Sequence, residues 1–243
     1  MRLRRRGPPQ LESAHSFFCY RAPVPTQAER RASTRAELLD AAAATLSDHG
    51  ATRFTTTEVV RRAGLSNGAL FRHFPTRHSL VAATVEHVLG QLRSDFDAAY
   101  AAAGGAGGAN LAVRDLLALV WNVMVDPRLA AVYDAYASAR TDDALRSAIE
   151  PVVRAHLERL AHVGQEVLAR LPGVDVELAE RASYLAVMAM QGQVVNATVL
   201  PEAADGTELL ASLERTAEAL LATVTTPGAP ASHRRSAVKV APC

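Results

Sequence analysis

The sequence predicts an all-α protein in which a small amino-terminal helix-turn-helix domain precedes a larger helical domain. Aromatic residues make up only 5% of the 243 residues, and alanine and leucine are plentiful, a composition typical of close-packed helices. Apolar residues recur at helical spacing through most of the chain. Capping residues, glycines and prolines stand where these periodic segments begin and end.

The two ends of the chain have compositions typical of disordered segments. Residues 1–32 are rich in arginine and polar residues and contain the helix-breaking prolines Pro8, Pro9, Pro23 and Pro25. Residues 226–243 have a similar character. We therefore expect two ordered domains, at residues 33–80 and 81–225, between two disordered tails.

Targeting signals are not evident in the sequence. The basic amino terminus is not followed by the apolar run of a signal peptide, and no apolar run reaches the ~18 residues that a membrane span needs. Cys19 and Cys243 lie in the two tails and offer neither a disulfide framework nor a metal site. We expect a cytoplasmic protein without a membrane partner, a metal or a cofactor.

Charge is unevenly distributed along the chain, although the net charge is only +1. Residues 1–80 hold 13 arginines and six acidic residues, whereas residues 81–243 hold 13 basic and 19 acidic residues. A basic amino-terminal third on an acidic body indicates that one region faces a polyanion. A basic tail without such a role would produce the same asymmetry.

The first two helices of the small domain are predicted from their caps. The capping boxes Thr34-x-x-Glu37 and Thr55-x-x-Glu58 should open them, and Gly50 should end the first. Inward-facing apolar residues support both helices: Leu39, Ala42, Ala43 and Leu46 in the first, and Val59, Val60 and Ala63 in the second.

Two further helices are expected to follow within the small domain. Gly64 should form a tight turn, because only glycine takes a positive φ angle at little cost. Ser66 is placed to cap a third helix that reaches about Phe74. Pro75 then separates a fourth helix, for which Thr76 is the expected cap.

The larger domain is predicted to be helical throughout. Helices are expected at about residues 91–102, 111–125, 127–140, 142–170, 176–199 and 207–224, with a glycine-rich loop at 104–110. Pro151 should kink or divide the helix at 142–170. We find no internal repeat and no segment typical of a strand.

Two residues near the turn are unfavourable for local stability. Gly68 lies inside a short helix, where glycine costs about 1 kcal/mol relative to alanine. Arg77 places a cation at the start of a helix, where it opposes the helix dipole. The first turn at residues 77–79 contains no acidic residue. Close approach of another backbone would explain Gly68, and a phosphate would suit both Arg77 and the helix end.

Residues 33–80 resemble the DNA-binding domain of the tetracycline-repressor (TetR) family. The family pattern combines an alanine-rich helix, a glycine, a threonine pair and the motif Ala-Gly-x-Ser-x-Gly-x-Leu-aromatic-x-His-Phe, followed by a basic residue. It occurs here as Leu39–Ala43, Gly50, Thr55-Thr56, Ala63-Gly64-Leu65-Ser66, Gly68, Leu70-Phe71, His73-Phe74 and Arg77. The resemblance covers about a fifth of the chain.

This resemblance implies a homodimeric, ligand-responsive transcriptional regulator that binds an inverted-repeat DNA operator, most often as a repressor. By matching positions, the residues that face base edges in the major groove are Asn67, Gly68, Ala69, Arg72 and His73. Those that lie along phosphates are Thr56, Thr57, Ser66, Phe71 and Arg77. Leu65, Leu70 and Phe74 are expected to belong to the core.

Arg72 and Asn67 are the side chains best suited to reading bases. An arginine can donate two hydrogen bonds to guanine, and an asparagine can pair with adenine in the same way. Two residues depart from the family pattern. Phe71 stands where the family often has tyrosine, so a hydroxyl contact to phosphate is missing. Arg77 replaces the commoner lysine.

Two other functions are compatible with parts of the sequence. A basic protein with this motif could be a non-regulatory architectural DNA-binding protein. Gly64-Leu65-Ser66-Asn67-Gly68 also fits the G-x-S-x-G nucleophile elbow of α/β-hydrolases, which requires a strand before the serine. A helix-capping signal precedes it instead, so we do not expect an enzyme.

The last two long helices are expected to form a four-helix dimer interface, if the family resemblance holds. The residues predicted to face the partner are Ala182, Leu185, Ala189, Gly192, Leu209, Leu213, Leu220 and Val224. An intramolecular core is the alternative for each of them.

An effector pocket is expected between the middle helices. The larger or polar residues on these alanine- and leucine-rich helices are its candidates: Trp121, Met124, Tyr133, Tyr136, Met188 and Gln191. Plain core packing is the alternative. The sequence shows no cluster of positive residues among them, which favours a neutral or cationic apolar effector.

Overall fold

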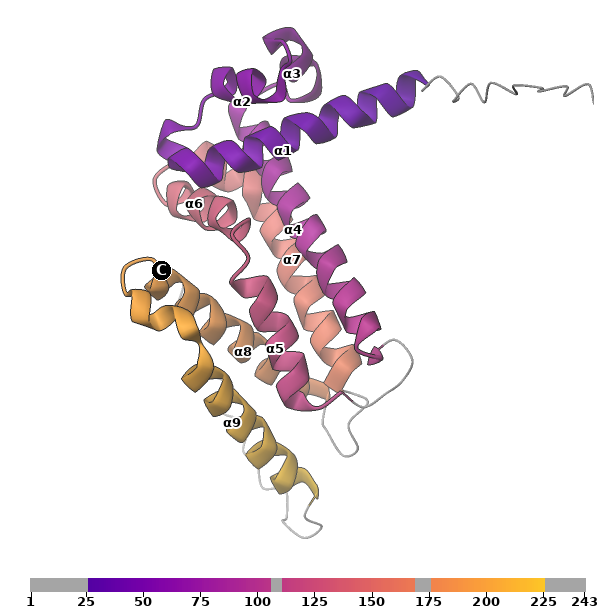
Figure 1. Cartoon of the computed structure of the whole chain (residues 1–243), viewed down its shortest axis with the longest axis vertical. Coiled ribbons are helices and arrows are strands. Elements are labelled where there is room, and N and C mark those ends of the chain that lie inside the picture. The colour runs from indigo at the N-terminus through magenta and orange to yellow at the C-terminus, as the bar shows by residue number, and fades with distance from the viewer. Residues whose placement is uncertain (1–25, 106–110, 169–175, 226–243) are drawn as a thin grey trace, which may run out of the picture.

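The computed structural model of the chain describes residues 26–105, 111–168 and 176–225, and these contain helices and no strand. Figure 1 shows the amino-terminal helices grouped at one end of the molecule and an elongated helical body below them. The long helices α4 (Arg77–Ala102) and α7 (Asp143–Leu168) run side by side down that body. Helices α8 (Val176–Ala197) and α9 (Thr207–Thr225) lie on its other side. The all-α prediction is confirmed.

The helices of the amino-terminal end are α1 (Gln27–Arg53), α2 (Thr56–Ala63), α3 (Asn67–His73) and α4 (Arg77–Ala102). The body continues with α5 (Val113–Met124), α6 (Leu129–Ala139), α7 (Asp143–Leu168) and α8 (Val176–Ala197). The 3-10 helix η2 (Pro201–Asp205) leads into α9 (Thr207–Thr225). These bounds agree with the predicted helices to within a few residues, except at two places. Helix α1 starts earlier than predicted, and the helix expected at residues 91–102 is the second half of α4, which continues through Gly90 without a break.

Helix α1 begins earlier than the sequence analysis predicted. The capping box that opens it is formed by Thr26 and Glu29, not by Thr34 and Glu37. The backbone N–H of Thr26 donates to Glu29 Oε2 at 2.6 Å, and Glu29 N–H donates to Thr26 Oγ1 at 3.2 Å. Residues 27–32 are therefore helical and not part of a disordered tail. Residues 1–25 and 226–243 lie outside the described residues.

The other predicted caps and turns are confirmed, except that Thr55 and Glu58 form only half of the predicted capping box. The Glu58 carboxylate accepts hydrogen bonds from Arg61 instead of from the backbone of Thr55. Thr55, Ser66 and Thr76 each accept a hydrogen bond from a backbone N–H of the helix that follows. Gly50 interrupts α1 with a φ of 69°, and Gly64 ends α2 with a φ of 66°. Pro151 lies inside α7 without dividing it.

Two apolar clusters hold the fold together. The larger cluster joins α1–α4 to α6 and the start of α7, and its fully buried members include Leu38, Leu70, Leu80, Val85 and Leu145. Because helix α4 contributes to this cluster along most of its length, the expected domain boundary at residue 80 falls inside a continuous packed helix. The smaller cluster, built around Trp121, Met124 and Met190, joins α5, α8 and α9.

No single helix in the described ranges is long and apolar enough to cross a membrane. Only α5 and α6 taken together reach that length and composition, and they are bent by 67° at their junction.

Candidate nucleic-acid interface and ligand cavity

Helices α2 and α3 form a helix-turn-helix at the end of the molecule. The turn depends on Gly64, whose left-handed conformation lets Leu65 N–H donate to Val60 O at 3.0 Å. Ser66 then caps α3, because its Oγ accepts a hydrogen bond from Ala69 N–H at 3.2 Å. Leu70 and Phe74 are buried in the larger apolar cluster, and Leu65 is half-buried against it. These contacts leave the opposite face of α3 in solvent.

The five residues predicted to read bases lie together on α3. Asn67, Gly68 and Arg72 are exposed, while Ala69 and His73 are half-buried. The Arg72 guanidinium makes no hydrogen bond or ion pair with any residue that the structure describes. The helix therefore presents a free arginine fork at its solvent face, which suits base reading.

The contacts of Gly68 with the described residues do not explain why this position is a glycine. A Cβ built on it would meet only Ser66 Oγ, at 3.9 Å, which is ordinary van der Waals distance. Packing within the described chain therefore does not require glycine here, whereas a surface that approaches the helix from outside would.

The residues predicted to lie along phosphates differ more from one another in their exposure to solvent. Thr57, Ser66 and Phe71 are exposed, with Phe71 at 48% the most exposed of the aromatic side chains in this domain. Thr56 is half-buried, and the hydroxyl of Ser66 is already used as the cap of α3.

Arg77 has an intramolecular role that the sequence analysis did not foresee. Its guanidinium Nη2 donates to Ala51 O at 2.6 Å and its Nε donates to Phe54 O at 3.3 Å. The same group lies 5.6 Å from the centre of the Phe54 ring. Arg77 thus holds the α1–α2 corner to the start of α4, and its unusual position is explained without a ligand.

The first turn of α4 is also better satisfied than expected. Ser79 N–H donates to Thr76 Oγ1 at 3.0 Å, and Thr76 N–H donates to Ser79 Oγ at 3.0 Å. These two hydrogen bonds give partners to backbone N–H groups that the sequence analysis expected to be free. No acidic residue lies in that turn.

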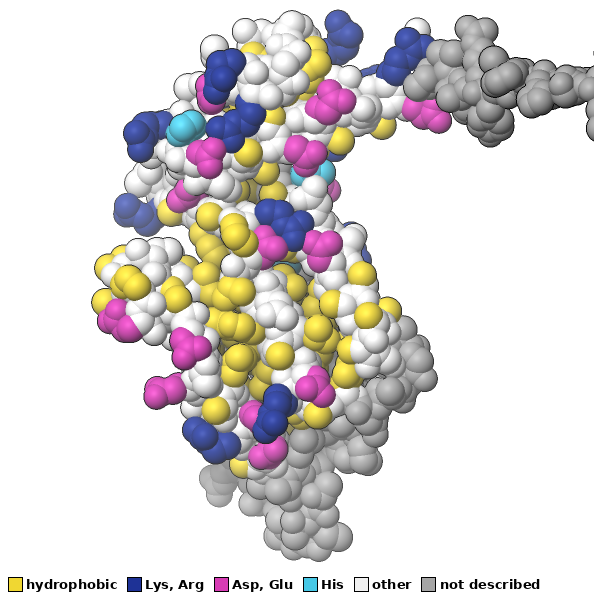
Figure 2. Space-filling model, viewed as in Figure 1, with side chains coloured by type: hydrophobic (Ala, Val, Ile, Leu, Met, Phe, Trp, Pro, Cys, Tyr) yellow, Lys and Arg dark blue, Asp and Glu magenta, His cyan; other side chains and the backbone are white. Residues whose placement is uncertain are grey.

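Arg31 and Arg35 are candidate interface residues that the sequence analysis missed. Arg35 lies 5.5 Å from the centre of the Phe74 ring, which places it beside the end of α3. Burial lowers the pKa of His73, and the nearby charges of Arg31, Arg35 and Arg72 lower it further. The positive charge of α1 and α3 is therefore concentrated in one place. Figure 2 shows arginines over this end of the molecule.

Replacing Arg77 with alanine should destabilise the fold. The change removes two hydrogen bonds to backbone carbonyls and leaves those carbonyls partly buried, so we expect a loss of about 1–2 kcal/mol in the free energy of unfolding. Urea denaturation followed by circular dichroism would measure it. Arg53→Ala, an exposed residue of the same corner, is the control and should change stability by less than about 0.5 kcal/mol. Unchanged stability in Arg77→Ala with weaker DNA binding would instead restore the predicted phosphate contact.

Two adjoining cavities lie in the body, between the two apolar clusters. They measure about 150 and 170 Å³ and share Leu89, Met124, Leu129 and His156 among their walls. The second is lined by five of the six predicted pocket residues: Met124, Tyr133, Tyr136, Met188 and Gln191. Trp121 lines neither cavity, because it packs against Met124 and Met190 in the smaller cluster.

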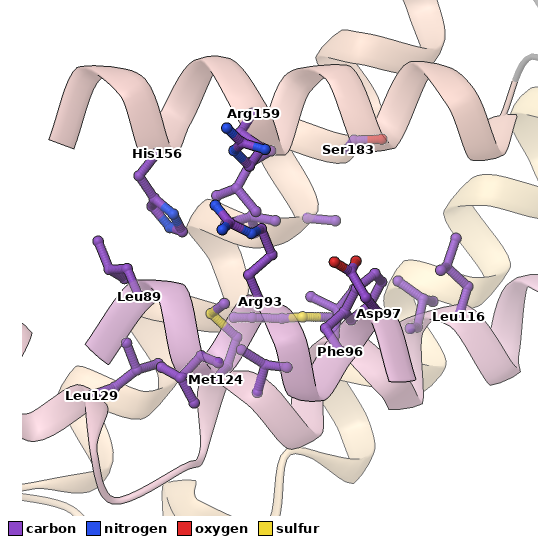
Figure 3. Close-up of a pocket in the computed structure, with 18 residues that line it drawn as sticks. Leu89, Arg93, Phe96, Asp97, Leu116, Met124, Leu129, His156, Arg159 and Ser183 are labelled. Carbon is purple, nitrogen blue, oxygen red and sulfur yellow. The ribbon is translucent and has the colours of Figure 1, made fainter. Parts of the chain in front are cut away.

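The polarity of this region differs from the prediction. The second cavity, which holds most of the predicted residues, has no lysine or arginine among its described lining residues. Arg93 and Arg159 line the first cavity together with His156 (Figure 3), and the sequence analysis did not expect positive residues in this region. The two arginines lie on helices α4 and α7, 66 residues apart, which is why no local pattern revealed them. In the second cavity, burial raises the pKa of Tyr133 and of Tyr136 to about 12, and both stay neutral donors.

The residues predicted for a dimer interface divide into two groups. On α8, Leu185 is 66% exposed, Ala189 and Gly192 are exposed, and Ala182 is half-buried. On α9, Leu209 and Leu213 pack against the Trp121 cluster of their own chain, which is the intramolecular alternative. Leu220 is half-buried, and the side chain of Val224 lies outside the described part of the structure.

The geometry of a nucleophile elbow is not present at Ser66. Helix α2 precedes this serine, whereas the elbow requires a strand. The Ser66 hydroxyl caps α3 and has an ordinary structural role.

An all-helical chain with an exposed, basic helix-turn-helix belongs to the class of helix-turn-helix DNA-binding proteins. The sequence comparisons define it further. The profile of the bacterial regulatory proteins of the tetR family matches residues 38–84. Over 150 residues the chain is 30% identical to an uncharacterised HTH-type transcriptional regulator of Mycobacterium tuberculosis, which covers 62% of this chain and 73% of that relative. The chain described here therefore belongs to the TetR family of transcriptional regulators.

Other relatives and solved structures agree with this assignment. The chain is 40% identical over 67 residues to the regulator CymR of Pseudomonas putida, which covers 28% of this chain and 33% of that one. A TetR-family regulator from Rhodococcus sp. has a TM-score of 0.57 at 19% identity, over 76% of this chain and 98% of that chain. FadR of Bacillus subtilis, solved with stearoyl-CoA, has a TM-score of 0.52 at 18% identity, over 78% and 97%.

Proposed function

We propose that this regulator is a homodimeric repressor that binds an inverted-repeat operator and is released by a small-molecule effector. The observation that carries the DNA-binding part is the free face of α3, where Asn67, Gly68 and Arg72 are exposed beside Arg31 and Arg35. Base edges are read by Asn67, Gly68, Ala69, Arg72 and His73. Thr56, Thr57, Ser66 and Phe71 lie along the phosphates, and Arg77 shapes the corner behind them.

The apolar face of α8 supports a dimer. Tyr184, Leu185 and Val195 are 50%, 66% and 46% exposed, and Val199 is 79% exposed. Leu185, Ala189, Gly192 and Val195 recur every three or four positions and form one stripe on α8, with Tyr184 next to Leu185 and Val199 just beyond the end of the helix. A stripe of large apolar side chains in water marks a contact surface. A twofold dimer would place two α3 helices on two half-sites of one operator.

The cavities between the two clusters support an effector-binding role. Their walls include residues of α4, which directly follows and packs with the helix-turn-helix, and residues of α8, which presents the exposed stripe. A ligand that prefers one spacing of these helices would change the separation of the two α3 helices. A structural neighbour of this fold, FadR of Bacillus subtilis, was solved with stearoyl-CoA.

A footprint on the DNA upstream of the protein's own gene would test the proposal. The experiment compares protection at about 50 and 200 mM salt, because contacts to phosphate alone weaken steeply over this range. We expect a protected inverted repeat that persists at the higher salt. Diffuse protection that disappears, at this DNA and across a library of random sequences, would favour the architectural alternative.

Arg72→Ala should relax the sequence preference at one base pair in each half-site. A bidentate contact contributes about 1–3 kcal/mol of discrimination, so the preferred base should lose roughly tenfold or more of its advantage. Selection from an operator library randomised at each position would measure this. Arg61→Ala is the control, since Arg61 is exposed and pairs with Glu58; it should leave the preference unchanged. A uniform loss of affinity at every position would assign Arg72 to the phosphates.

Phe71→Tyr should strengthen operator binding at every sequence. Phe71 is exposed on α3, and a tyrosine there would add a hydroxyl that can donate to a phosphate oxygen. A single added hydrogen bond is worth about 0.5–1.5 kcal/mol, so we expect a two- to tenfold lower Kd by fluorescence anisotropy. Equal Kd values for the two proteins would place Phe71 away from the DNA backbone.

A further inference from the structure

The first cavity has two arginines at its mouth that no acidic residue neutralises. Arg93 and Arg159 are exposed and come from α4 and α7, and in Figure 3 their guanidinium groups point toward each other. Neither has an ion pair or a hydrogen bond to any residue that the structure describes. By contrast, Arg154 on α7 pairs with Glu150 at 2.7 Å, and Arg128 pairs with Asp126 at 2.8 Å.

The space behind these arginines is apolar. Its walls include Leu89, Leu92, Met124, Leu129 and Met190, which are all nearly buried. Asp97, one turn beyond Arg93 on α4, is the one acidic residue among the described residues that line the cavity. Two guanidinium groups against one carboxylate leave an excess of positive charge at the entrance.

The pKa of His156 is affected by the same positive charges. His156 lies on α7 one turn before Arg159, and Figure 3 shows its ring pointing into the cavity. Burial lowers the pKa of His156, and the charges of Arg93 and Arg159 lower it further. Like charges that face one another without a counterion are unfavourable, and an anion between them would remove that cost.

We infer that the effector is an amphiphile with an anionic head group, a carboxylate or a phosphate, held between Arg93 and Arg159, and with an apolar tail in the cavity behind them. Both guanidinium groups offer planar, paired donors that match such a head group. The tail fills the space among α4, α5, α7 and α8. This inference rests on the proposed effector-binding function and specifies the chemistry of its ligand.

The location of this site also suggests how binding is transmitted. Leu89, Leu92 and Leu129 belong to the cluster that holds the helix-turn-helix, whereas Met124 and Met190 belong to the cluster that joins α8 and α9. A ligand between them contacts both clusters. Because the anion attracts Arg93 toward Arg159, it biases the position of α4 relative to α7 and hence the position of α3.

A matched set of ligands tests the inference. Linear alkanoates from hexanoate to palmitate, and decyl phosphate, are compared with the alcohol and the amine of the same chain length, each below its micelle concentration. Binding to the full-length protein is followed through the fluorescence of Trp121, the one tryptophan of the chain, and through Tm. We expect the anionic ligands to bind about tenfold or more tightly than the matched alcohols, and the amines to bind most weakly.

Three variants assign the selectivity to the two arginines. Arg93→Gln, Arg159→Gln and the double variant should lose that advantage for the anions and keep the affinity for the alcohols. Arg154→Gln carries the same substitution on the same helix outside the cavity and should bind like the wild type. All four should keep the wild-type Tm without ligand, because the substituted groups are exposed.

Several outcomes would overturn the inference. These are equal affinity for the anion, the alcohol and the amine, absence of binding by the whole series, or unchanged anion binding in the double variant. A double variant that becomes monomeric would assign the arginines to a subunit contact instead. Operator binding is measured separately by anisotropy without ligand, so a failure of the proposed DNA-binding function is distinguished from a failure of the ligand assignment.

Discussion

Replacing Gly68 with alanine is expected to stabilise the folded protein and to weaken its binding to operator DNA. The stabilisation follows from the structure of α3. A Cβ at this position meets only Ser66 Oγ at 3.9 Å, so alanine fits without displacing anything. Alanine is favoured over glycine in a helix by about 0.5–1 kcal/mol. Urea denaturation should show a gain of this size in the free energy of unfolding.

The loss of DNA binding follows from the same open space. Gly68 is exposed beside Asn67 and Arg72, on the face of α3 proposed to enter the major groove. A methyl group there would separate the helix backbone from the groove wall and lengthen the contacts that its neighbours make. We expect the Kd for the operator to rise about tenfold or more, which corresponds to about 1.4 kcal/mol.

Gly90→Ala separates the two effects. Gly90 lies inside α4 with nothing within 4 Å of the position that a Cβ would occupy, far along the chain from the helix-turn-helix. Alanine there should stabilise the protein by a similar amount and leave the Kd for the operator unchanged. If Gly68→Ala binds the operator as tightly as the wild type, close approach of α3 to DNA is refuted.

The helices could be predicted from the sequence because their ends are marked by local chemistry. Thr55, Ser66 and Thr76 cap the helices that they were expected to cap, and Gly64 forms the expected turn. The start of α1 was misplaced because two capping patterns follow one another in the sequence, Thr26-x-x-Glu29 and Thr34-x-x-Glu37. The earlier pattern prevails, and its residue Glu29 completes a reciprocal pair of hydrogen bonds.

The roles that depend on distant residues could not be predicted. The sequence predicted a phosphate contact for Arg77 from its position at the start of a helix and from the family resemblance. Its hydrogen bonds to the carbonyls of Ala51 and Phe54 could not be predicted, because these residues lie more than 20 positions earlier in the chain. The proximity of Arg93 and Arg159 likewise could not be predicted, because it depends on α4 and α7 bringing the two residues to one cavity. Local patterns identify caps, turns and recognition motifs, whereas the chemistry of a cavity depends on which helices face each other.

Gly206→Ala is expected to cause the largest loss of stability among these substitutions. Gly206 is buried at the corner between η2 and α9, with a φ of 65°. A Cβ there would lie 2.2 Å from Cζ2 of Trp121 and 2.7 Å from Cη2. The indole ring cannot retreat freely, because it packs against Met124 and Met190.

The expected loss has two parts. A left-handed conformation costs a non-glycine residue about 1–2 kcal/mol, and overpacking a buried contact costs about 1–3 kcal/mol more. The sum should lower the free energy of unfolding by roughly 2–5 kcal/mol, as measured by urea denaturation at one fixed protein concentration. The concentration is fixed because subunit association contributes to apparent stability. The Trp121 emission of the folded variant should also shift.

Gly64→Ala isolates the contact with Trp121 from the backbone strain. Gly64 has a φ of 66°, nearly that of Gly206, but nothing lies within 4 Å of its Cβ position. Its alanine variant should therefore lose only the 1–2 kcal/mol of backbone strain and keep the wild-type emission of Trp121. Equal losses in the two variants would show that α9 can move away from α5 at little cost. A larger loss in Gly206→Ala would instead establish that the indole of Trp121 fixes α9 against α5.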